Sequence, residues 1–253
     1  MSKNMKNKIK EKAIHHTNIM HKIYKEEIMY SIKNTKLYTE EDIILDDKID
    51  TNQNIELIAT DSVDAAFRYN NKVCILNFAS YKKPGGGFIN GSIAQEECLC
   101  HESTLYNVLK TQYECFYNEN KLSLKNGLYS NRALYSPNII FEYDSKIKKV
   151  DVLTCAAPNY AYAKTKNIGR KLNSTVLRNR IRFILSIIYK ENVDTVILGA
   201  FGCGVFGQNP KEVSKIFKEE ISNIFGNSNK TKFIFAIPNE NGENYTQFSK
   251  VLC

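Results

Sequence analysis

Five short apolar segments, rich in β-branched residues, constrain the fold of this chain most. Several are apolar at every position rather than at alternate ones, which is typical of strands in a sheet that is covered on both faces. They lie at residues 55–60, 73–79, 150–157, 195–201 and 233–238. Helical patterns occur between them, at residues 61–69, 92–116, 165–190 and 210–221. This alternation predicts an α/β sandwich in which helices cover a central sheet.

The N-terminal part of the chain differs from the rest. Residues 8–36 are lysine-rich and are predicted to be helical, because isoleucines recur there at helix-like spacing. We expect this stripe to pack on the domain that follows; it comprises Ile9, Ile14, Ile19, Ile23, Ile28 and Ile32. Residues 38–54 are polar and acidic and indicate a loop or extended connector. We therefore predict a helical extension with its connector at residues 1–54 and one domain at residues 55–253.

Composition narrows the class of protein. The net charge is +8, from 35 basic and 27 acidic residues. This charge indicates either an ordinary solvated surface or attraction to an acidic polymer such as nucleic acid or another polyphosphate. No apolar run reaches the roughly 18–20 residues that span a bilayer, so no membrane partner is expected. Seven scattered cysteines without a CxxC pair favour a reducing, cytoplasmic compartment.

A glycine-rich loop follows the apolar segment at residues 195–201. It reads GAFGCGVFGQNPKEV and precedes a predicted helix. Glycines there allow backbone N–H groups to approach a phosphate, and a helix N-terminus adds favourable potential. Residues 202–207 also match GxGxxG, but they lie too late in the chain for a dinucleotide-binding fold of the dehydrogenase type. The loop thus predicts diphosphate binding, and the ring of Phe206 either lies against a sugar or base or folds back onto the core.

A second glycine-rich segment reads PGGGFINGSIAQEECLC and begins at Pro84. Ser92 and Gln95 form a capping-box pattern, which predicts a helix that starts near Ile93. Glu96 and Glu97 would then lie in its first turns, where the helix dipole stabilises carboxylates. Neighbouring helical residues point about 100° apart, so the two cannot face each other across one bond. One glutamate would perform proton chemistry while the other holds the substrate.

These motifs resemble the poly(ADP-ribose) glycohydrolase family. The run PGGGFINGSIAQEE is similar to the family's GGG, spacer, QEE signature, and ILNFAS and LCHESTLY are similar to its microbial branch. VDVLTCAAPN and ILGAFGCGVFGQNP resemble its later motifs, so the similarity covers roughly residues 55–240. The resemblance implies a macrodomain-like fold: a mixed, mostly parallel sheet between helices, with an ADP-ribose cleft at the strand ends.

The resemblance also implies residue roles. Glu97 would be the catalytic acid/base, and Glu96 would position the ribose through its hydroxyls. Phe206 would lie over the terminal ribose. The other substrate-binding residues would be Asn77, Gly85, Gly86, Gly87, Gln95, Gly202, Cys203, Gly204 and Val205.

The implied activity is hydrolysis of ribose–ribose O-glycosidic bonds in poly(ADP-ribose), which releases ADP-ribose through an oxocarbenium-like transition state. No metal or other cofactor is expected. Three alternatives remain: a module that binds ADP-ribose without cleaving it, a hydrolase of another ADP-ribosyl linkage on protein or nucleic acid, and a nucleic-acid-binding protein. The last would use the N-terminus, where nine lysines face three acids over residues 1–36, but it lacks interleaved aromatic residues. Nucleic acid is therefore expected only as an ADP-ribosylated target.

Overall fold

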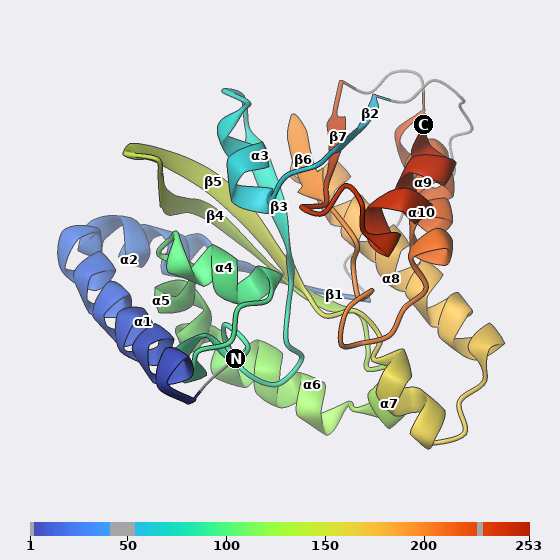
Figure 1. Ribbon diagram of the computed structural model, residues 1–253, viewed down its shortest axis with the longest axis horizontal. Coiled ribbons are helices and arrows are strands. Elements are labelled where there is room, and N and C mark those ends of the chain that lie inside the picture. The colour runs from blue at the N-terminus through green and yellow to red at the C-terminus, as the bar shows by residue number, and fades with distance from the viewer. Residues whose placement is uncertain (1–2, 41–53, 227–229) are drawn as a thin grey trace.

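A seven-stranded mixed sheet forms the centre of the molecule (Figure 1). The computed structural model describes residues 3–40, 54–226 and 230–253. In the order β1-β4-β5-β3-β6-β7-β2, the last five strands run parallel, while β4 is antiparallel to both of its neighbours. The strands are β1 (Lys36–Thr39), β2 (Ile55–Ile58), β3 (Val73–Phe78), β4 (Arg132–Tyr143), β5 (Lys146–Cys155), β6 (Thr195–Leu198) and β7 (Lys232–Ala236). The predicted mixed, mostly parallel α/β sheet is confirmed.

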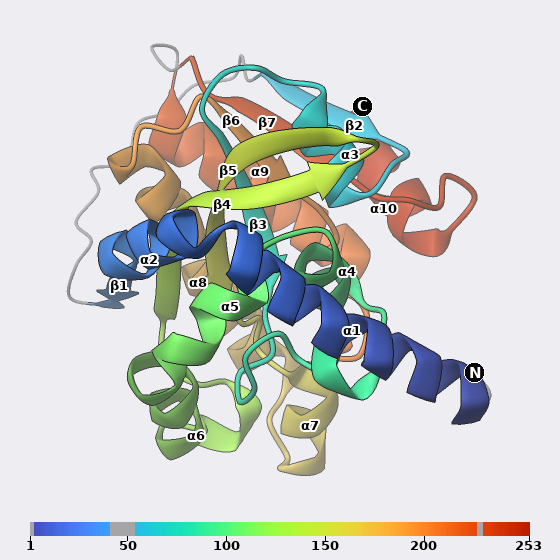
Figure 2. The ribbon, with the colours of Figure 1, turned by 90° about the vertical axis from the view of Figure 1, so that its left-hand side faces the viewer.

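Helices cover both faces of the sheet, as Figures 1 and 2 show from two sides. One face carries α8 (Arg170–Lys190), α9 (Pro210–Phe225) and α10 (Glu243–Leu252). The other carries α1 (Lys3–Ile23), α2 (Lys25–Asn34), α3 (Ser62–Phe67), α4 (Gln95–His101) and α5 (Leu105–Leu109). Short helices α6 (Glu119–Leu122) and α7 (Tyr160–Thr165) lie between these elements in the chain.

The central strand β3 explains why its sequence is apolar throughout. Cys74 and Leu76 pack into the core beneath α8 and α9, whereas Val73 and Ile75 pack into the core beneath α3, α4 and α5. Alternate side chains of a strand point to opposite faces, so a strand covered on both sides needs apolar residues at every position. The five apolar segments of the sequence are accordingly the five parallel strands.

Two strands were not predicted, β1 and β4. The register of β4 with β5 shifts between Ser136 and Ile139, and Asn138 has a left-handed backbone with φ of 56°. Pro137 lies inside this irregularity, where its missing N–H removes no regular ladder bond. The interruption hides a 12-residue strand from a pattern based on regular alternation.

The single helix predicted at residues 92–116 is wrong. The chain forms α4, then α5, and then a π-helical segment at Tyr113–Asn118. The break falls where residues 102–104 pair with β4: the Thr104 N–H donates to the Ile140 carbonyl at 2.9 Å, and the Glu142 N–H donates to the Glu102 carbonyl at 2.8 Å. Backbone groups that bond to a strand cannot also continue a helical ladder.

The N-terminal residues form α1 and α2, as predicted, but the isoleucine stripe packs only in part: Ile28 is buried in the core and Ile32 packs against it. Ile14, Ile19 and Ile23 are exposed, and the buried positions of these helices include Ala13 and Met20. Residues 36–39 add β1 to the edge of the sheet beside β4. The division into an extension and a domain at residue 54 stays a prediction, and most of the predicted connector, residues 41–53, lies outside the described residues.

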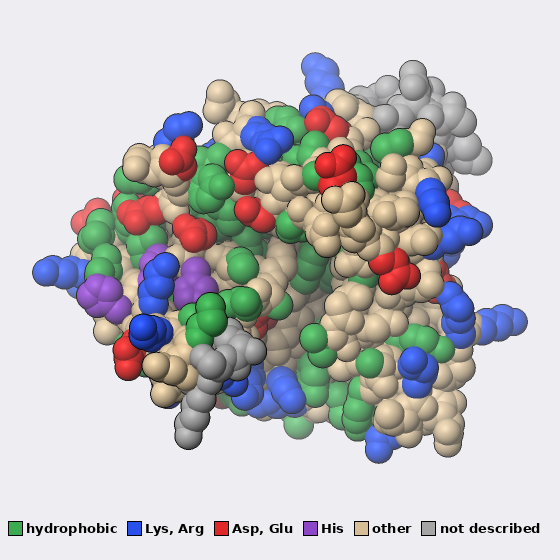
Figure 3. Space-filling model, in the orientation of Figure 1, with side chains coloured by type: hydrophobic (Ala, Val, Ile, Leu, Met, Phe, Trp, Pro, Cys, Tyr) green, Lys and Arg blue, Asp and Glu red, His purple; other side chains and the backbone are tan. Residues whose placement is uncertain are grey.

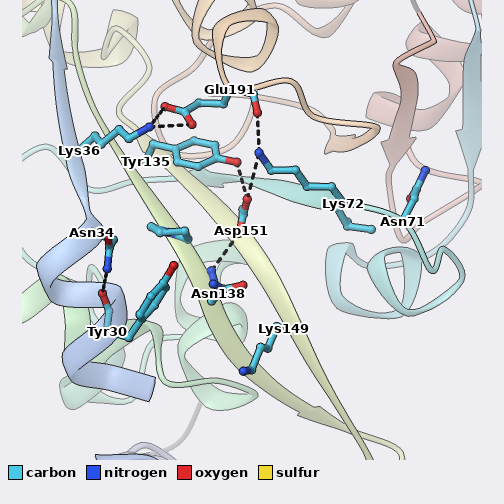
Figure 4. Close-up of a pocket in the computed structure, with 12 residues that line it drawn as sticks. Tyr30, Asn34, Lys36, Asn71, Lys72, Tyr135, Asn138, Lys149, Asp151 and Glu191 are labelled. Atoms are coloured by element: carbon cyan, nitrogen blue, oxygen red, sulfur yellow. Dashed lines mark hydrogen bonds and ion pairs between the residues drawn. The ribbon is translucent and has the colours of Figure 1, made fainter. Parts of the chain in front are cut away.

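The edge of the sheet at the amino end of β3 carries a charged network around a cavity of about 440 Å³ (Figure 4). Lys36 Nζ pairs with Glu191 Oε1 at 2.8 Å, and Lys72 Nζ donates to the Glu191 carbonyl oxygen at 2.5 Å. Asp151 accepts from the Tyr135 hydroxyl at 2.5 Å. Together these contacts join β1, β4, β5 and the C-terminus of α8.

The helices of the described residues include none whose length and hydropathy would allow it to span a membrane.

Candidate active site

A cavity of about 640 Å³ opens at the carboxyl ends of the central strands β5, β3 and β6. In Figure 3 it is the hollow near the middle of the face. Open parallel sheets bind ligands at this edge, because the loops that follow adjacent strands converge there. Its lining consists of Phe78, Ala79, Ser80, Tyr81, Lys82, Gly86, Ala94, Gln95, Glu96, Glu97, Ala157, Asn159, Tyr162, Ala200, Gly202, Gly204, Val205 and Phe206.

The GGG segment forms a tight turn against the two glutamates. Gly85 and Gly86 have φ angles of 61° and 59°, in the left-handed region that glycine tolerates best. A methyl group on Gly86 would lie 2.4 Å from Oε1 of Glu97 and 2.9 Å from Oε2 of Glu96. The absence of a side chain at Gly86 therefore makes room for both carboxylates.

Glu97 is held by backbone donors from two different turns. Its Oε1 accepts from the Gly87 N–H at 2.6 Å, and its Oε2 accepts from the Ala94 N–H at 2.9 Å. The side chain is only 6% exposed, yet it lines the cavity. The helix begins at Gln95 with Ala94 as its N-cap, so the predicted start near Ile93 with Ser92 as the cap is wrong.

Glu96 lies beside Glu97 and is 3% exposed. Its Oε2 accepts from the Ser80 N–H at 2.7 Å, and its Oε1 faces Asn77 Nδ2 at 3.4 Å. Burial, opposed by these hydrogen bonds and reinforced by the charge of Glu97, raises the pKa of Glu96 from 4.5 to about 8. Near neutral pH this carboxyl is thus largely protonated and can donate a hydrogen bond as well as accept one.

The raised pKa of Glu96 predicts how stability depends on pH. Between about 4.5 and about 8, the native state keeps a proton on Glu96 that the unfolded chain releases. The free energy of unfolding must therefore fall as pH increases through this window, and the loss ends above the folded pKa. In Glu96→Gln this contribution is absent. Urea unfolding of both proteins across the window should give curves that diverge with pH, whereas parallel curves would contradict the shifted pKa.

Two amides position the glutamates. Gln95 lines the cavity, but its side chain mainly joins α4 to β3: Oε1 accepts from the Phe78 N–H at 2.9 Å, and Nε2 donates to the Leu76 carbonyl oxygen at 2.9 Å. Asn77 is fully buried behind Glu96 and also contacts Thr154 Oγ1 at 3.3 Å. Both amides therefore hold the frame of the site, and Asn77 does not line the cavity.

The loop between β6 and α9 forms the opposite wall. Gly202 has a φ of 75°, and its carbonyl oxygen accepts from the Gln208 N–H at 3.0 Å, which closes the loop into a compact turn. The space around Gly204 is open, with nothing within 4 Å of an added methyl group, and Val205 is 87% exposed. The turn uses the N–H groups of Cys203, Gly207 and Gln208, whereas no backbone carbonyl of the described residues accepts those of Gly204 and Val205, which can therefore donate to an anion.

Phe206 lines the cavity and also packs partly against the core beneath α8 and α9. The helix α9 begins at Pro210, and Asn209 caps it by accepting from the Glu212 N–H at 3.0 Å. The N-terminus of α9, the positive end of its helix dipole, thus comes directly after the glycine-rich loop, as the sequence predicts.

The structure brings most of the predicted residues to one cavity but not all of them. Those that line it are Gly86, Gln95, Glu96, Glu97, Gly202, Gly204, Val205 and Phe206. Four others, Asn77, Gly85, Gly87 and Cys203, do not. Gly87 still acts on the site through its N–H, whereas Cys203 packs toward the core, where burial raises the pKa of its thiol to about 12.

Sequence reasoning missed an aromatic rim. Tyr81 stacks on Tyr129 with ring centroids 4.9 Å apart, and Tyr162 reaches the cavity from α7. The fully buried Arg180 donates from Nη2 to the carbonyl oxygens of Leu128, Tyr129 and Ser130 and so fixes the Tyr129 segment. Tyr81 lies just before the three glycines, so its place at the cavity could have been predicted. No signal in the sequence indicates that Tyr129 stacks on it or that Tyr162 lines the same cavity.

The chemistry of the site is that of buried carboxylates and backbone donors. Within residues 3–40, 54–226 and 230–253, no three His, Cys, Asp or Glu side chains gather as a metal site would require. The buried carboxyl of Glu97 therefore lies next to the carboxyl of Glu96, whose pKa is raised, and across the cavity from the glycine-rich loop between β6 and α9. This arrangement suits acid/base cleavage of a bond in a ligand that carries an anionic group.

Comparisons with known proteins agree with this geometry. Residues 4–142 match the family described as microbial-type PARG, catalytic domain, where PARG denotes poly(ADP-ribose) glycohydrolase. The structure is similar to that of poly(ADP-ribose) glycohydrolase from Thermomonospora curvata bound to the inhibitor ADP-HPD, with a TM-score of 0.81 and 24% identity over 96% of this chain and 99% of that one. It is also similar to the enzyme from Deinococcus radiodurans in complex with ADP-ribose, with a TM-score of 0.77 and 28% identity over 89% and 96% of the two chains. No curated protein sequence matches the chain.

Proposed function

The chain belongs to the microbial-type poly(ADP-ribose) glycohydrolase family, and from this premise we propose that its cleft hydrolyses ribose–ribose O-glycosidic bonds with Glu97 as the acid/base. The observation that carries the proposal is the position of Glu97: a buried carboxyl that faces the cavity and is fixed by the N–H groups of Gly87 and Ala94. A carboxyl held at both oxygens needs no reorientation when the substrate arrives.

In the proposed reaction, protonated Glu97 donates its proton to the leaving ribose oxygen while the bond from that oxygen to the anomeric carbon breaks. Water adds to the resulting oxocarbenium-like centre, and its proton passes to Glu97, which restores the starting state. Glu96 holds the hydroxyls of the same ribose. Because its pKa of about 8 keeps it protonated near neutral pH, Glu96 does so without placing a negative charge beside the carboxyl that donates the proton.

The diphosphate is assigned to the opposite wall. The N–H groups of Gly204 and Val205, which no backbone carbonyl of the described residues accepts, and the positive end of the 16-residue helix α9 favour an anion there. Phe206 then lies over the terminal ribose. Gly85, Gly86 and Gly87 shape the turn that brings this ribose to the carboxylates, and Asn77 and Gln95 keep the turn and α4 in register with β3.

We further propose poly(ADP-ribose) or ADP-ribosylated macromolecules as partners and ADP-ribose as the product. The division at residue 54, with residues 55–253 as the catalytic domain, belongs to the same proposal. A reducing cytoplasmic location is proposed because all seven cysteines are free thiols.

The test is the release of free ADP-ribose. The wild-type protein should liberate ADP-ribose from purified poly(ADP-ribose) and leave mono-ADP-ribosylated protein largely intact, as measured by chromatography of both reactions. If ADP-ribose binds but neither substrate is cleaved, the protein is a binding module. If only the mono-ADP-ribosylated protein is cleaved, the cleft acts on a different linkage.

A further inference from the structure

The first turns of α1 lie beside the catalytic wall. The short turn at Phe88–Asn90 follows Gly87 directly and contacts α1. A methyl group on Gly91 would lie 2.5 Å from the carbonyl oxygen of Lys6. A short path therefore connects Glu97 with the N-terminus of α1 through the Gly87 N–H, this turn and Gly91.

Further contacts fix α1 onto α5 and onto the residues that join α4 to α5. His16 Nε2 lies 3.0 Å from the Ser103 carbonyl oxygen, and Asn107 Nδ2 donates to the Thr17 carbonyl oxygen at 3.1 Å. In Figure 1, α1 lies on the side of α4 that faces away from the loop between β6 and α9. The helix is thus attached to the wall that holds the carboxylates, across the site from the assigned diphosphate loop.

This part of α1 carries an unbalanced positive charge. Three lysines, Lys6, Lys8 and Lys10, are exposed and make no ion pair among the described residues, whereas the exposed Lys12 lies near Glu102. The only acid within the helix is Glu11, and its first turn contains none. Figure 3 shows Lys and His side chains over this part of the molecule, beside the hollow.

The arrangement opposes helix stability. Lys6 and Lys10, like Lys8 and Lys12, are four residues apart and repel each other along the helix surface. Cations at a helix N-terminus also interact unfavourably with the helix dipole. A solvated helix with no anionic partner would be more stable with acids in these positions. The charges therefore point to an anion that binds there.

We propose that the N-terminal half of α1 is a polyanion-binding surface that holds the part of the poly(ADP-ribose) chain that remains beyond the scissile bond. The inference rests on the proposed function. If the terminal ADP-ribose unit fills the cavity between Phe206 and Glu97, the leaving ribose lies past Glu97, and the following units continue toward the turn at residues 88–90 and α1. Each of those units carries a diphosphate, which the exposed lysines attract without requiring a defined pocket.

The test uses the full chain with Glu97→Gln, so that the polymer is not consumed. Lys6→Gln, Lys8→Gln and Lys10→Gln are combined in this background; Lys12 is left unchanged because it neighbours Glu102. The matched control combines Lys146→Gln, Lys149→Gln and Lys230→Gln, three exposed lysines near the amino ends of β5 and β7, at the opposite edge of the sheet. A third variant with arginine at positions 6, 8 and 10 keeps the charge.

We expect the first variant to bind long poly(ADP-ribose) about tenfold more weakly at low salt and to lower the slope of log affinity against log salt by about 2, since each lost contact removes roughly 0.7. The control and the arginine variant should bind the polymer like the parent protein. All four proteins should bind free ADP-ribose equally, because the cavity is unchanged, and their helix content should agree by circular dichroism.

Unchanged polymer affinity in the first variant would overturn the inference, and so would an equal loss in the control, which would indicate only the net charge. If unmodified single-stranded RNA binds the parent as tightly as the polymer and loses affinity in the same variant, the surface is a nucleic-acid site and the inference fails. Failure of the proposed function looks different: the wild-type protein would release no ADP-ribose, whatever the lysine variants bind.

Discussion

Glu97→Gln is expected to lower the rate of ADP-ribose release from poly(ADP-ribose) by about 10³-fold or more, because in the proposed reaction this one group supplies both the proton for the leaving oxygen and the base for water. The amide can neither donate a proton to the leaving group nor accept one from water. Its effect on ground-state binding should be small, since the wall at residues 202–206, to which we assign the diphosphate, is untouched. Single-turnover release of ADP-ribose and calorimetric binding of ADP-ribose measure the two quantities separately.

One structural consequence of Glu97→Gln must be measured with it. Both carboxylate oxygens accept N–H groups, from Gly87 and Ala94, so the amide nitrogen of glutamine would face one of these donors. A mismatch of this kind costs about 1–3 kcal/mol of stability, and the variant should unfold at a correspondingly lower urea concentration. A folded variant that binds ADP-ribose but does not cleave the polymer supports the assignment.

Glu96→Gln is the matched control for this change. The pKa of about 8 means that Glu96 is already largely neutral near pH 7, so glutamine imitates its protonated state. We expect its rate to fall far less than that of Glu97→Gln, by about tenfold or less, through weaker contacts with the ribose. If Glu96→Gln abolishes turnover while Glu97→Gln retains it, the two roles are reversed.

The parallel part of the sheet could be predicted from sequence because a strand that is buried on both faces needs a continuous run of apolar residues, and such a run is visible in the sequence itself. Strand β3 is apolar at consecutive positions, because its alternate residues are buried in the two cores on either face of the sheet. Strand β4 could not be predicted, because Pro137 and the bulge beside it interrupt the alternation, and because β1, its partner on the side away from β5, comes from a distant part of the sequence. The break after α4 has the same origin, since residues 102–104 bond to β4.

The candidate site likewise contains some features that the sequence predicts and others that depend on distant residues. Glu96 and Glu97 could be singled out because two adjacent carboxylates beside three glycines are unfavourable without a ligand or fixed donors. The cap could not be predicted, because Ser92 fits the capping-box pattern while the actual N-cap is Ala94, two residues further along the chain. Tyr129 supports Tyr81 of the cavity lining by stacking on it, and the buried Arg180 of α8 holds the Tyr129 backbone through a contact across 51 residues of sequence.

Gly86→Ala is expected to reduce turnover by about 10²-fold or more, a second large effect, and by a different route. The new methyl group would lie 2.4 Å from Oε1 of Glu97, and the φ of 59° is unfavourable for alanine. The side chain of Glu97 is the more mobile partner, so it must turn away and lose its bond to the Gly87 N–H. The loss of rate should therefore exceed what the loss of stability suggests, as measured by turnover of the polymer beside urea unfolding.

Two other glycines separate a displaced carboxylate from the general cost of alanine. An added methyl group at Gly169, at the start of α8, meets nothing within 4 Å, so Gly169→Ala should cost no more than about 1 kcal/mol of stability and leave turnover unchanged. Gly204 is equally open, but it belongs to the wall assigned to the diphosphate. Gly204→Ala should fold normally and weaken ADP-ribose binding, whereas Gly86→Ala should bind ADP-ribose more nearly normally and fail in cleavage. If Gly86→Ala instead cleaves the polymer at the wild-type rate, Glu97 does not need the position that its two N–H donors give it, and its assignment as the acid/base loses its main support.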